Sequence, residues 1–504
     1  MSTDDPAIVH NGQAIELRAV PVMPVDRFRE WVVRGVASGA RLAALFVTPA
    51  THGPTRRLMA VLARPASADL SLLACEVGQA YPSLTPDCPS AHGFEREIAE
   101  QWAIRPEGHP WLKPIRFQPS RLSTSGDVQP GALPSVMDFF AMTGEEVHEV
   151  AVGPVHAGVI EPGHFRFQCH GETVHHLEIS LGYQHRGVER ALCGGPTART
   201  IHYMETLAGD TTIGHTTAYC RAMEALAGLR PLARSEAIRA IASELERIAN
   251  HVGDLGALAG DVGFLPTMSY CGRIRGDVLN LTALLCGNRF GRGLVTVGGV
   301  RHDVDDALAT EILHRLDAID KDASGAVDLL FNAPSVLARF ESTGAVSEDL
   351  ARELGLVGVA ARASGVPCDV RQEFPYGLYR FTQMPVCTWP TGDCFARAYV
   401  RWLEVQQSIA FVREHLRSLP AGVTQQEVKP PKAHSVVVTL AEGWRGEICH
   451  VAATDGDGRF AFYKVVDPSF HNWFGLACAL RQQQISDFPL CNKSFNLSYC
   501  GHDL

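Results

Sequence analysis

Cysteine is the residue type in this chain whose spacing could reveal a metal or iron–sulfur site. The sequence contains fourteen cysteines, and none of them forms a Cys-x-x-Cys pair. Iron–sulfur and zinc sites usually show such tight spacing, because neighbouring thiolates must reach one ion or cluster. The acidic, polar start does not resemble an export signal, so we expect reduced and mostly buried thiols. The chain alone is therefore predicted to bind no metal and no cofactor.

Three further motifs carry weaker chemical signals. Asp455-Gly-Asp-Gly458 lacks the later carboxylates of a calcium loop, so a hairpin turn is expected there. The stretch 291–299 is rich in glycine but lacks the strand–Gly-x-Gly-x-x-Gly–helix context of a dinucleotide-binding fold, and we expect a loop. His175 and His176 are adjacent in a predicted strand and point to opposite faces, so they cannot bind one metal together.

The elements that must position these residues divide into two units. Short apolar runs at 42–47 and 58–63 predict strands, and the charged and apolar pattern of 94–102 predicts a short amphipathic helix. Residues 118–145 are rich in proline, glycine and serine, which predicts a linker. The expected fold class is α+β, with a small N-terminal α/β domain over 1–117 and a mainly helical core domain with flanking strands over 146–504.

The second unit shows its periodicity most clearly in one long helix. Apolar residues recur at spacings of three and four from about 234 to 258, which gives the helix one apolar face. A second long helix is expected over roughly 396–416. Residues 159–167 and 172–181 predict paired strands that turn at Gly171, and strand-like runs return over 435–462.

Composition limits the classes of function. The formal net charge is −10, which argues against a nucleic-acid partner, because a phosphate backbone requires a basic surface. No apolar stretch approaches the roughly 20 residues that span a bilayer, so any membrane association is expected to come through partner subunits.

Longer strings of residues resemble a known family over nearly the whole chain. Tyr81-Pro-Ser-Leu-Thr and Ile104-Arg-Pro-Glu-Gly-His-Pro110 resemble the 30-kDa subunit of complex I. The second unit resembles the 49-kDa subunit and the large subunit of nickel–iron hydrogenases, most closely the membrane-bound formate-hydrogenlyase type. The strings that carry this second resemblance include Glu161-Pro-Gly-His-Phe-Arg166, Leu181-Gly-Tyr-Gln-His-Arg-Gly-Val-Glu189, Glu244-Leu-Glu-Arg-Ile-Ala-Asn-His251, Asp369-Val-Arg371 and Arg445-Gly-Glu447.

The sequence departs from the hydrogenases at the residues that would bind nickel and iron. The resemblance implies two Cys-x-x-Cys pairs, because soft thiolates hold nickel and bridge it to iron. The early pair, just before His215-Thr-Thr-Ala-Tyr219, reads Ala208 and Thr211, and the late pair aligns with Ser498 and Gly501. The resemblance combined with these four residues predicts a variant without a nickel–iron centre.

The quinone contacts that complex I would imply are also changed. The position of the quinone-binding tyrosine reads Gly209, the histidine position falls at or beside Pro162, and the histidine near the terminal cluster becomes Gly291. Asp261 matches the pocket aspartate of complex I, and Arg445 matches an arginine kept in both families.

Glu161, Asp261 and Arg445 are therefore the candidate catalytic residues. Two alternatives stay open for them: proton transfer or binding of a polar substrate on one side, and a structural ion-pair network on the other. His185 lies in a matched string and is the candidate cofactor-contacting residue, with a structural histidine near the helical core as the alternative.

The resemblance implies the large peripheral-arm subunit of a membrane-bound oxidoreductase on the cytoplasmic side of the plasma membrane. Expected partners are a small iron–sulfur subunit, a ferredoxin-like subunit and membrane ion-translocating subunits. Quinone or NAD(H) would act at the level of the complex. Three functions follow as alternatives: electron transfer coupled to ion translocation, a non-catalytic scaffold, or an active formate-hydrogenlyase-type hydrogenase.

Overall fold

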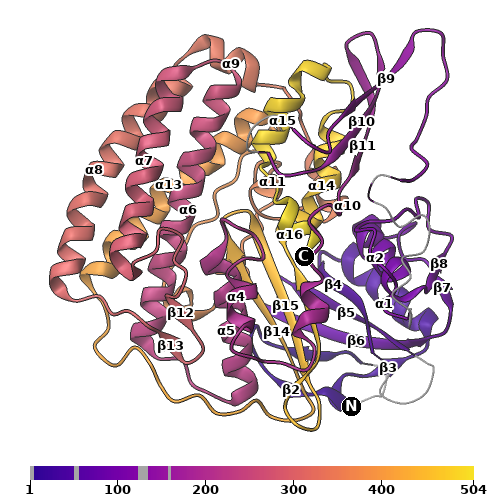
Figure 1. Cartoon of the computed structure of the whole chain (residues 1–504), viewed down its shortest axis with the longest axis horizontal. Coiled ribbons are helices and arrows are strands. Elements are labelled where there is room, and N and C mark those ends of the chain that lie inside the picture. The colour runs from indigo at the N-terminus through magenta and orange to yellow at the C-terminus, as the bar shows by residue number, and fades with distance from the viewer. Residues whose placement is uncertain (1–4, 50–55, 123–133, 135, 157–159) are drawn as a thin grey trace.

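The structure is a computed structural model, which describes residues 5–49, 56–122, 134, 136–156 and 160–504. Long helices form one side of the molecule, a sheet occupies its centre, and the N-terminal unit lies against the opposite side of that sheet (Figure 1). The last helix, α16 (Tyr499–Asp503), returns to the middle of the molecule beside the central sheet (Figure 1). The C-terminal end of the chain therefore lies near the centre of the molecule (Figure 1).

The N-terminal unit is a sheet covered by two helices. Strands β6, β5 and β4 pair antiparallel in that order, β1 pairs with the outer edge of β6, and β3 pairs parallel with β6. A separate pair, β7–β8, is parallel. The elements are β1 (Ala7–Val9), β3 (Val22–Met23), α1 (Val25–Ala37), β4 (Arg41–Thr48), β5 (Arg56–Arg64), β6 (Asp69–Val77), β7 (Ala80–Pro82), α2 (His92–Trp102) and β8 (Arg105–Glu107), with short 3₁₀ turns η1 (Leu17–Ala19) and η2 (Pro89–Ala91).

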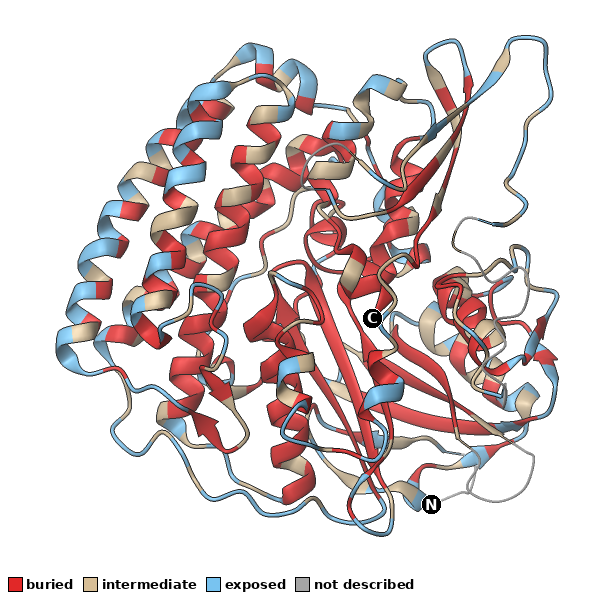
Figure 2. Cartoon of the chain, in the orientation of Figure 1, coloured by how far each residue is buried: buried red, intermediate tan, exposed pale blue. Residues whose placement is uncertain are grey.

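The central sheet joins the two units. Its order is β16–β15–β14–β2, in which β14 (Ser435–Gly443), β15 (Gly446–Thr454) and β16 (Phe460–Val466) come from the end of the chain and β2 (Ile15–Glu16) from its beginning. Every residue of β14 and β15 is buried, as Figure 2 shows in red. Apolar residues of the N-terminal sheet and of β14 and β15 share one core, so the two units pack as one body.

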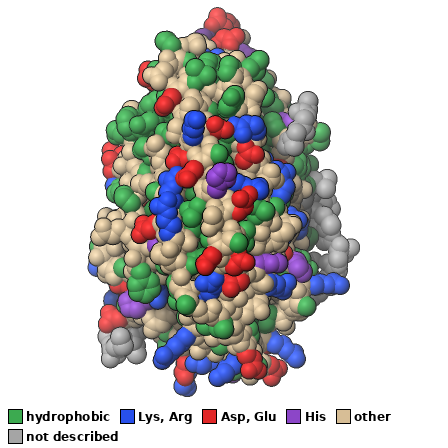
Figure 3. Space-filling view, turned by 90° about the vertical axis from the view of Figure 1, so that its left-hand side faces the viewer, with side chains coloured by type: hydrophobic (Ala, Val, Ile, Leu, Met, Phe, Trp, Pro, Cys, Tyr) green, Lys and Arg blue, Asp and Glu red, His purple; other side chains and the backbone are tan. Residues whose placement is uncertain are grey.

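Four long helices build the other side of the molecule: α6 (Ala233–Asp261), α7 (Leu265–Cys286), α8 (Asp306–Phe331) and α13 (Cys394–Arg417). Helix α6 packs against both α7 and α13, and α8 lies outermost with a long exposed stripe (Figure 2). Figure 3 shows this outer face, where acidic and basic side chains are intermixed. Such mixing is typical of a solvated helix face rather than of a phosphate-binding surface.

The remaining elements connect these layers. A three-stranded sheet is formed by β9 (Val147–Val152), β10 (His164–His170) and β11 (Thr173–Ser180), with β10 in the middle. The others are α3 (Val188–Leu192), α4 (Thr200–Met204), α5 (Thr212–Ala227), β12 (Val295–Thr296), β13 (Gly299–Val300), α9 (Pro334–Phe340), α10 (Glu348–Leu354), α11 (Gly358–Arg362), α12 (Val370–Glu373), η3 (Gly377–Phe381), α14 (Pro468–Ala479), η4 (Ile485–Asp487) and α15 (Phe488–Phe495).

The expected α+β class is confirmed, and most predicted elements are present. The two long helices, the strands around residues 45 and 60, and the 455–458 turn between β15 and β16 all occur. The first strand of the pair near Gly171 begins at His164, later than predicted, and residues 157–159 lie outside the described residues. Residues 123–133 and 135 of the predicted linker also lie outside them, and the division into domains stays a prediction.

All fourteen cysteines are free thiols, and twelve of them are buried, in agreement with the packing role expected for them. No helix in the described part of the chain is long and apolar enough to cross a membrane.

Candidate functional site

Two segments far apart in the sequence lie side by side next to the central sheet: the loop 206–211 before α5 and the C-terminal segment 496–501. Arg186 joins them, because its Nη2 donates to Leu207 O at 2.9 Å and to Cys500 O at 3.2 Å. Arg445 joins them a second time, because its Nε donates to Asn496 O at 2.5 Å while its Nη atoms bind Asp210. These are the two segments in which the resemblance places the early and late cysteine pairs.

Arg445 occupies the turn between β14 and β15 and forms a two-point ion pair with Asp210. Its Nη1 and Nη2 lie 2.6 and 2.8 Å from the two carboxylate oxygens. The guanidinium lies 3.9 Å from the ring centre of Trp444, whose Nε1 donates to Asp210 O at 3.0 Å. Burial opposes the charge of Arg445, but Asp210 outweighs it and raises the pKa of the guanidinium. The arginine therefore stays charged and held in one orientation.

The turn leaves Arg445 little freedom because the backbone beside it is tightly packed. A Cβ atom placed on Gly358, the first residue of α11, would lie 1.9 Å from Arg445 O. Gly446 itself has a φ of +138°, a conformation that residues with a side chain rarely adopt. Glycine at both positions lets α11 approach the turn and fixes where the guanidinium points.

Glu161 lies at the same place, against the C-terminal segment. Its Oε2 accepts a hydrogen bond from Tyr499 N at 3.4 Å, and its charge acts on the half-buried thiol of Cys500. Burial, followed by Glu161, raises the pKa of Cys500 to about 11, although the backbone of Gly209 acts in the opposite direction. Without a bound metal ion, Cys500 is therefore a protonated thiol at neutral pH rather than a thiolate nucleophile.

The four positions at which the resemblance implies metal-binding cysteines have other contacts. Ala208 is buried, and Thr211 Oγ1 lies 3.4 Å from Arg445 Nη1. Ser498 caps α16, with its Oγ accepting from Gly501 N at 2.9 Å. A Cβ atom on Gly501 would lie 2.7 Å from the Asp467 carboxyl carbon, so the neighbouring carboxylate occupies the space that a side chain would need.

This packing gives a stability prediction. Replacing Gly501 by alanine should lower the free energy of unfolding by about 1–3 kcal/mol, because the added methyl group must displace Asp467. Gly272 is a matched control, because it also lies in a helix and has open space where its Cβ would stand, so its alanine variant should be neutral or slightly more stable. Chemical denaturation measures the free energy of unfolding of both variants. If they are equally stable, Asp467 does not crowd the position of Gly501.

A buried chain of hydrogen bonds leads from Asp467 into the core. Asp467 Oδ2 lies 3.0 Å from His215 Nε2, His215 Nδ1 lies 3.1 Å from His450 Nε2, and His450 Nδ1 lies 2.9 Å from the Tyr463 hydroxyl. Burial, followed by the neighbouring His215, holds the pKa of His450 well below its usual range. Burial opposes the charge of Asp467, but the hydrogen bond from His215 lowers the pKa of that carboxyl. These hydrogen bonds form a continuous path of exchangeable protons. Of its four residues, only His215 is identified from the sequence, in a string that resembles the family.

Glu246, a residue of α6, contacts the start of α5 beside the site. Its carboxylate accepts from Ile213 N at 2.7 Å and Gly214 N at 3.2 Å, where the free amide groups of a helix start favour an anion. Burial nevertheless dominates and raises the pKa of Glu246 to about 8, with Asp210 acting in the same direction. This carboxyl group can therefore take up and release a proton near neutral pH.

The raised pKa of Glu246 predicts a pH dependence of stability. Between its ordinary value of 4.5 and about 8, the folded chain holds this proton more firmly than the unfolded chain does, so stability falls as pH rises through that window. In Glu246→Gln the melting temperature should fall less between about pH 5 and pH 8 than in the wild type. Glu107→Gln, at an exposed position, should show the same change of melting temperature with pH as the wild type. If Glu246→Gln also shows the wild-type change, the raised pKa of Glu246 is contradicted.

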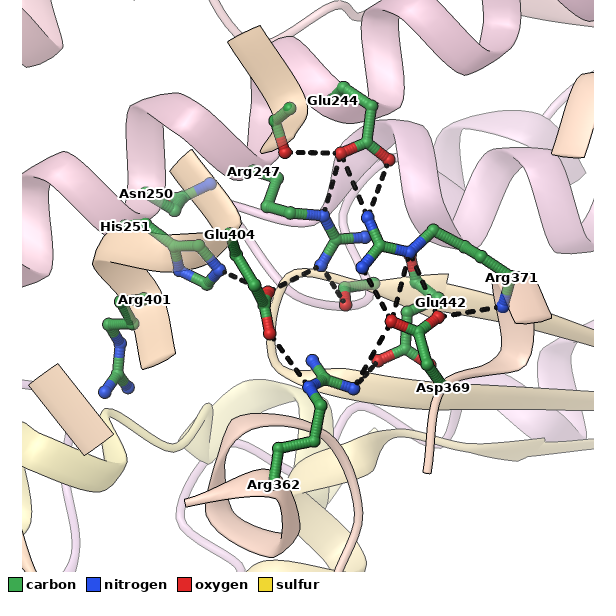
Figure 4. A network of polar contacts seen from close by, with 12 residues as sticks. Glu244, Arg247, Asn250, His251, Arg362, Asp369, Arg371, Arg401, Glu404 and Glu442 are labelled. Carbon is green, nitrogen blue, oxygen red and sulfur yellow. Dashed lines mark hydrogen bonds and ion pairs between the residues drawn. The ribbon is translucent and has the colours of Figure 1, made fainter. Parts of the chain in front are cut away.

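A buried network of charged groups lies beside the site, between α6, α11, α12, α13 and β14 (Figure 4). Arg362 lies 2.8 Å from Glu404 and 2.7 Å from Glu442, and Arg371 lies 2.6 Å from Asp369 and 3.1 Å from Glu244. All six side chains are at most 2% exposed. Burial, followed by Asp369, raises the pKa of Glu442 to about 7.

Helix α6 connects this network to the site through one polar stripe. Glu244, Arg247, His251 and Asp254 follow one another at spacings of three, four and three, which places them on one face of the helix. His251 Nε2 lies 2.8 Å from Glu404 Oε2, and Asp254 accepts from Arg401 Nε at 2.8 Å and from Asn496 Nδ2 at 2.6 Å. Polar residues at helical spacing within an otherwise apolar pattern are the sequence signal for this stripe.

The structure brings together two of the three predicted catalytic residues. Glu161 and Arg445 lie at the meeting of the two segments, whereas Asp261 is exposed at the last turn of α6. It lies seven residues, or roughly 10 Å along the helix axis, beyond Asp254, which makes the contact with the C-terminal segment. Although the residue is exposed, the surrounding protein removes part of the water around its carboxyl group and raises the pKa of Asp261 to about 6, and Lys493 acts against this. The role assigned to each of the three stays a prediction.

His185 contacts Asp503, just beyond segment 496–501, and within the described part of the chain it forms no hydrogen bond with Glu161 or Arg445. Its Nδ1 is 2.7 Å from Asp503 O, and it lines a pocket of about 100 Å³ that also contains Gln101 and Arg116. Burial lowers the pKa of His185, so the ring is neutral at pH 7. Among the described residues, no group of three or more His, Cys, Asp and Glu side chains is placed to hold a metal ion.

Comparison with known protein families places the fold. The family model of the 49-kDa subunit of respiratory-chain NADH dehydrogenase matches residues 261–437. The carbon monoxide-induced hydrogenase of Rhodospirillum rubrum is 30% identical over 350 residues, which cover 69% of this chain and 97% of that protein. Formate hydrogenlyase subunit 5 of Escherichia coli is 28% identical over 441 residues, which cover 84% of this chain and 77% of the relative.

A third relative comes from the quinone-reducing side of the family. NADH-quinone oxidoreductase subunit 4 of Thermus thermophilus is 28% identical over 369 residues, which cover 68% of this chain and 90% of that protein. The chain therefore belongs to the family of the 49-kDa subunit of respiratory-chain NADH dehydrogenase and its hydrogenase relatives. This is a family of oxidoreductase subunits, and the resemblance predicted for the second unit is confirmed.

Proposed function

We propose that this chain is the large peripheral-arm subunit of a membrane-bound oxidoreductase related to complex I and to energy-converting hydrogenases. It receives electrons from an adjacent iron–sulfur subunit, and the electron transfer is coupled to ion translocation. The names of its relatives support this proposal, since they are subunits of hydrogenases, of formate hydrogenlyase and of NADH-quinone oxidoreductase. The proposed position is on the cytoplasmic side of the plasma membrane, held there by partner subunits.

The observation that carries the proposal is the meeting of loop 206–211 with segment 496–501 around Arg445. Both segments are brought into contact from opposite ends of the second unit, although neither provides a cysteine at the positions that the resemblance assigns to metal ligands. An arrangement maintained by two arginines, with titratable groups around it, suits proton or electron transfer chemistry.

We infer that the residues present do not fit a nickel–iron centre. Such a centre requires soft thiolate ligands, and Ala208, Thr211, Ser498 and Gly501 provide none. Cys500 lies next to these positions but out of register with the pair, and Asp467 fills the space beside Gly501. The proposed complex therefore passes electrons to another acceptor, a quinone or NAD⁺. Its partners are a small iron–sulfur subunit, a ferredoxin-like subunit and membrane ion-translocating subunits.

The test is electron transfer in the purified intact complex. The iron–sulfur clusters are reduced with dithionite, excess reductant is removed, and cluster oxidation is followed by electron paramagnetic resonance after a soluble quinone or NAD⁺ is added. The proposal predicts oxidation by one of these acceptors that becomes slower in the Arg445→Ala complex. If the clusters stay reduced with every acceptor, the chain does not take part in electron transfer.

A non-catalytic scaffold is the second candidate, and the Arg445–Asp210 pair is the observation that favours it. Each partner neutralises the other, which leaves neither group free to bind a substrate. The scaffold predicts normal assembly and normal turnover of the complex when Arg445 is replaced.

A further inference from the structure

The largest of the described pockets lies far from the candidate site, at the opposite end of α6. It has a volume of about 730 Å³ and is bordered by the starting turn of α6, the end of α5, and η3. Glu236 in its wall and Asp254 at the candidate site are eighteen residues apart on α6, which corresponds to roughly 27 Å. The pocket is therefore a separate feature of the molecule, of a size that ordinary small-molecule sites have.

A buried arginine without a carboxylate partner faces this pocket. Arg221 is 8% exposed, and within the described residues it forms no ion pair with an acidic side chain. Its Nη1 donates to Leu440 O at 2.8 Å, and the remaining contacts, with Asn11, are long at 3.4 and 3.5 Å. Its guanidinium carbon lies 4.5 Å from the ring centre of Tyr376. Burial lowers the pKa of Arg221 to about 10, so the group still carries its charge at neutral pH.

The acidic residues in the pocket wall are already bound to another arginine. Glu224 lies 2.6 Å from Arg239 and accepts from Gly298 N at 2.8 Å, and Glu236 lies 2.8 Å from Arg239. Arg380, exposed at the edge of the pocket, adds a further positive charge. The charged groups around the pocket are the two carboxylates of Glu224 and Glu236 and the three guanidinium groups of Arg221, Arg239 and Arg380. Their sum is one positive charge, and Arg221 is the buried group without a carboxylate in contact.

The rest of the wall is apolar. Ala225, Leu229 and Leu378 line it, and Phe381 at its edge is 86% exposed, far more than is usual for a phenylalanine. An apolar surface that adjoins one unpaired guanidinium matches a ligand with one negative group and a hydrocarbon part.

We propose that this pocket binds an amphipathic monoanion, an alkyl chain that ends in a carboxylate or phosphate. The anionic head binds Arg221 with help from Arg380, and the alkyl chain lies along Leu378 and Phe381. Glu236 and Glu224 act on Arg221 from a distance but are ion-paired with Arg239, so the ligand supplies the direct counter-charge that the buried guanidinium lacks.

Isothermal titration of the full-length chain with dodecanoate tests this, below the concentration at which dodecanoate forms micelles. Dodecyl phosphate distinguishes the two kinds of head group, dodecan-1-ol lacks the charge, and acetate lacks the chain. We expect one saturable site for dodecanoate or dodecyl phosphate, with binding at least about tenfold weaker for dodecan-1-ol and for acetate. Equal binding of dodecan-1-ol, or no saturable binding of either anion, would overturn the proposal.

Variants locate the site. Phe381→Asp changes an exposed side chain and should preserve the fold while it weakens dodecanoate binding about tenfold or more. Arg221→Gln should weaken it about tenfold to a hundredfold, provided that its circular dichroism matches the wild type. Leu329→Asp is the control, since Leu329 is 51% exposed on α8, away from the pocket. If all three variants bind dodecanoate equally, the ligand binds elsewhere and the assignment is wrong.

Discussion

Replacing Arg362 by alanine is expected to lower the free energy of unfolding by about 3–5 kcal/mol. The side chain is fully buried and contacts two carboxylates, Glu404 at 2.8 Å and Glu442 at 2.7 Å. Although burial opposes it, Arg362 holds the pKa of Glu404 well below its usual range, so without the arginine a carboxylate must either stay charged in the core or take up a proton. Since domains are stable by only about 5–15 kcal/mol, the variant should be marginal.

Urea unfolding followed by circular dichroism measures this effect. Arg352→Ala is the matched control, because Arg352 forms an exposed pair with Glu348 on a helix surface and should contribute less than about 0.5 kcal/mol. A lower pH should restore part of the stability of Arg362→Ala. When Glu404 is protonated it is neutral and no longer requires a positive partner in the core. If both variants unfold at the same urea concentration, the buried network does not stabilise the fold as described.

Replacing Arg445 by alanine is expected to reduce turnover of the assembled complex by about tenfold to a hundredfold, which corresponds to the loss of one charged hydrogen-bond donor. The arginine fixes loop 206–211 to segment 496–501, so its removal changes both the charge and the geometry where the two segments meet. Arg445→Lys keeps the charge but cannot form the two-point contact with Asp210, and an intermediate activity is expected.

Assembly must be measured together with activity. Size-exclusion chromatography of the Arg445 variants should show the same complex as the wild type, so that lost turnover is not lost assembly. Wild-type turnover in an intact Arg445→Ala complex would favour the scaffold over electron transfer.

The helical part of the fold follows closely from the sequence because its apolar residues repeat at helical spacing. The helix expected over 234–258 extends to Asp261, where Gly260 lets Met268 of α7 approach to 3.0 Å from the position of a Cβ atom. The strand expected from residue 159 begins instead at His164. Pro162 precedes it and cannot donate a backbone hydrogen bond, and Gly163 packs against Tyr499.

The candidate site could be predicted in part. Family resemblance pointed to Glu161, Arg445 and Asp261 but gave no sign of Asp254, because the sequence of a helix does not reveal which turn another segment will contact. Asp210 and Asp467 were not singled out, since their partners Arg445 and His215 are 235 and 252 residues away and depend on the packing of the central sheet. The signal available for Asp467 is its place before Pro468, where it caps α14.

The nickel content of the purified complex tests the central claim most directly. We propose that the place where loop 206–211 meets segment 496–501 lacks thiolate ligands and serves electron transfer without a nickel–iron centre. Elemental analysis by mass spectrometry of the intact, active complex should then show nickel far below one atom per chain while iron is abundant. One nickel per chain, retained after extensive dialysis, would contradict the account and make the chain a hydrogenase subunit.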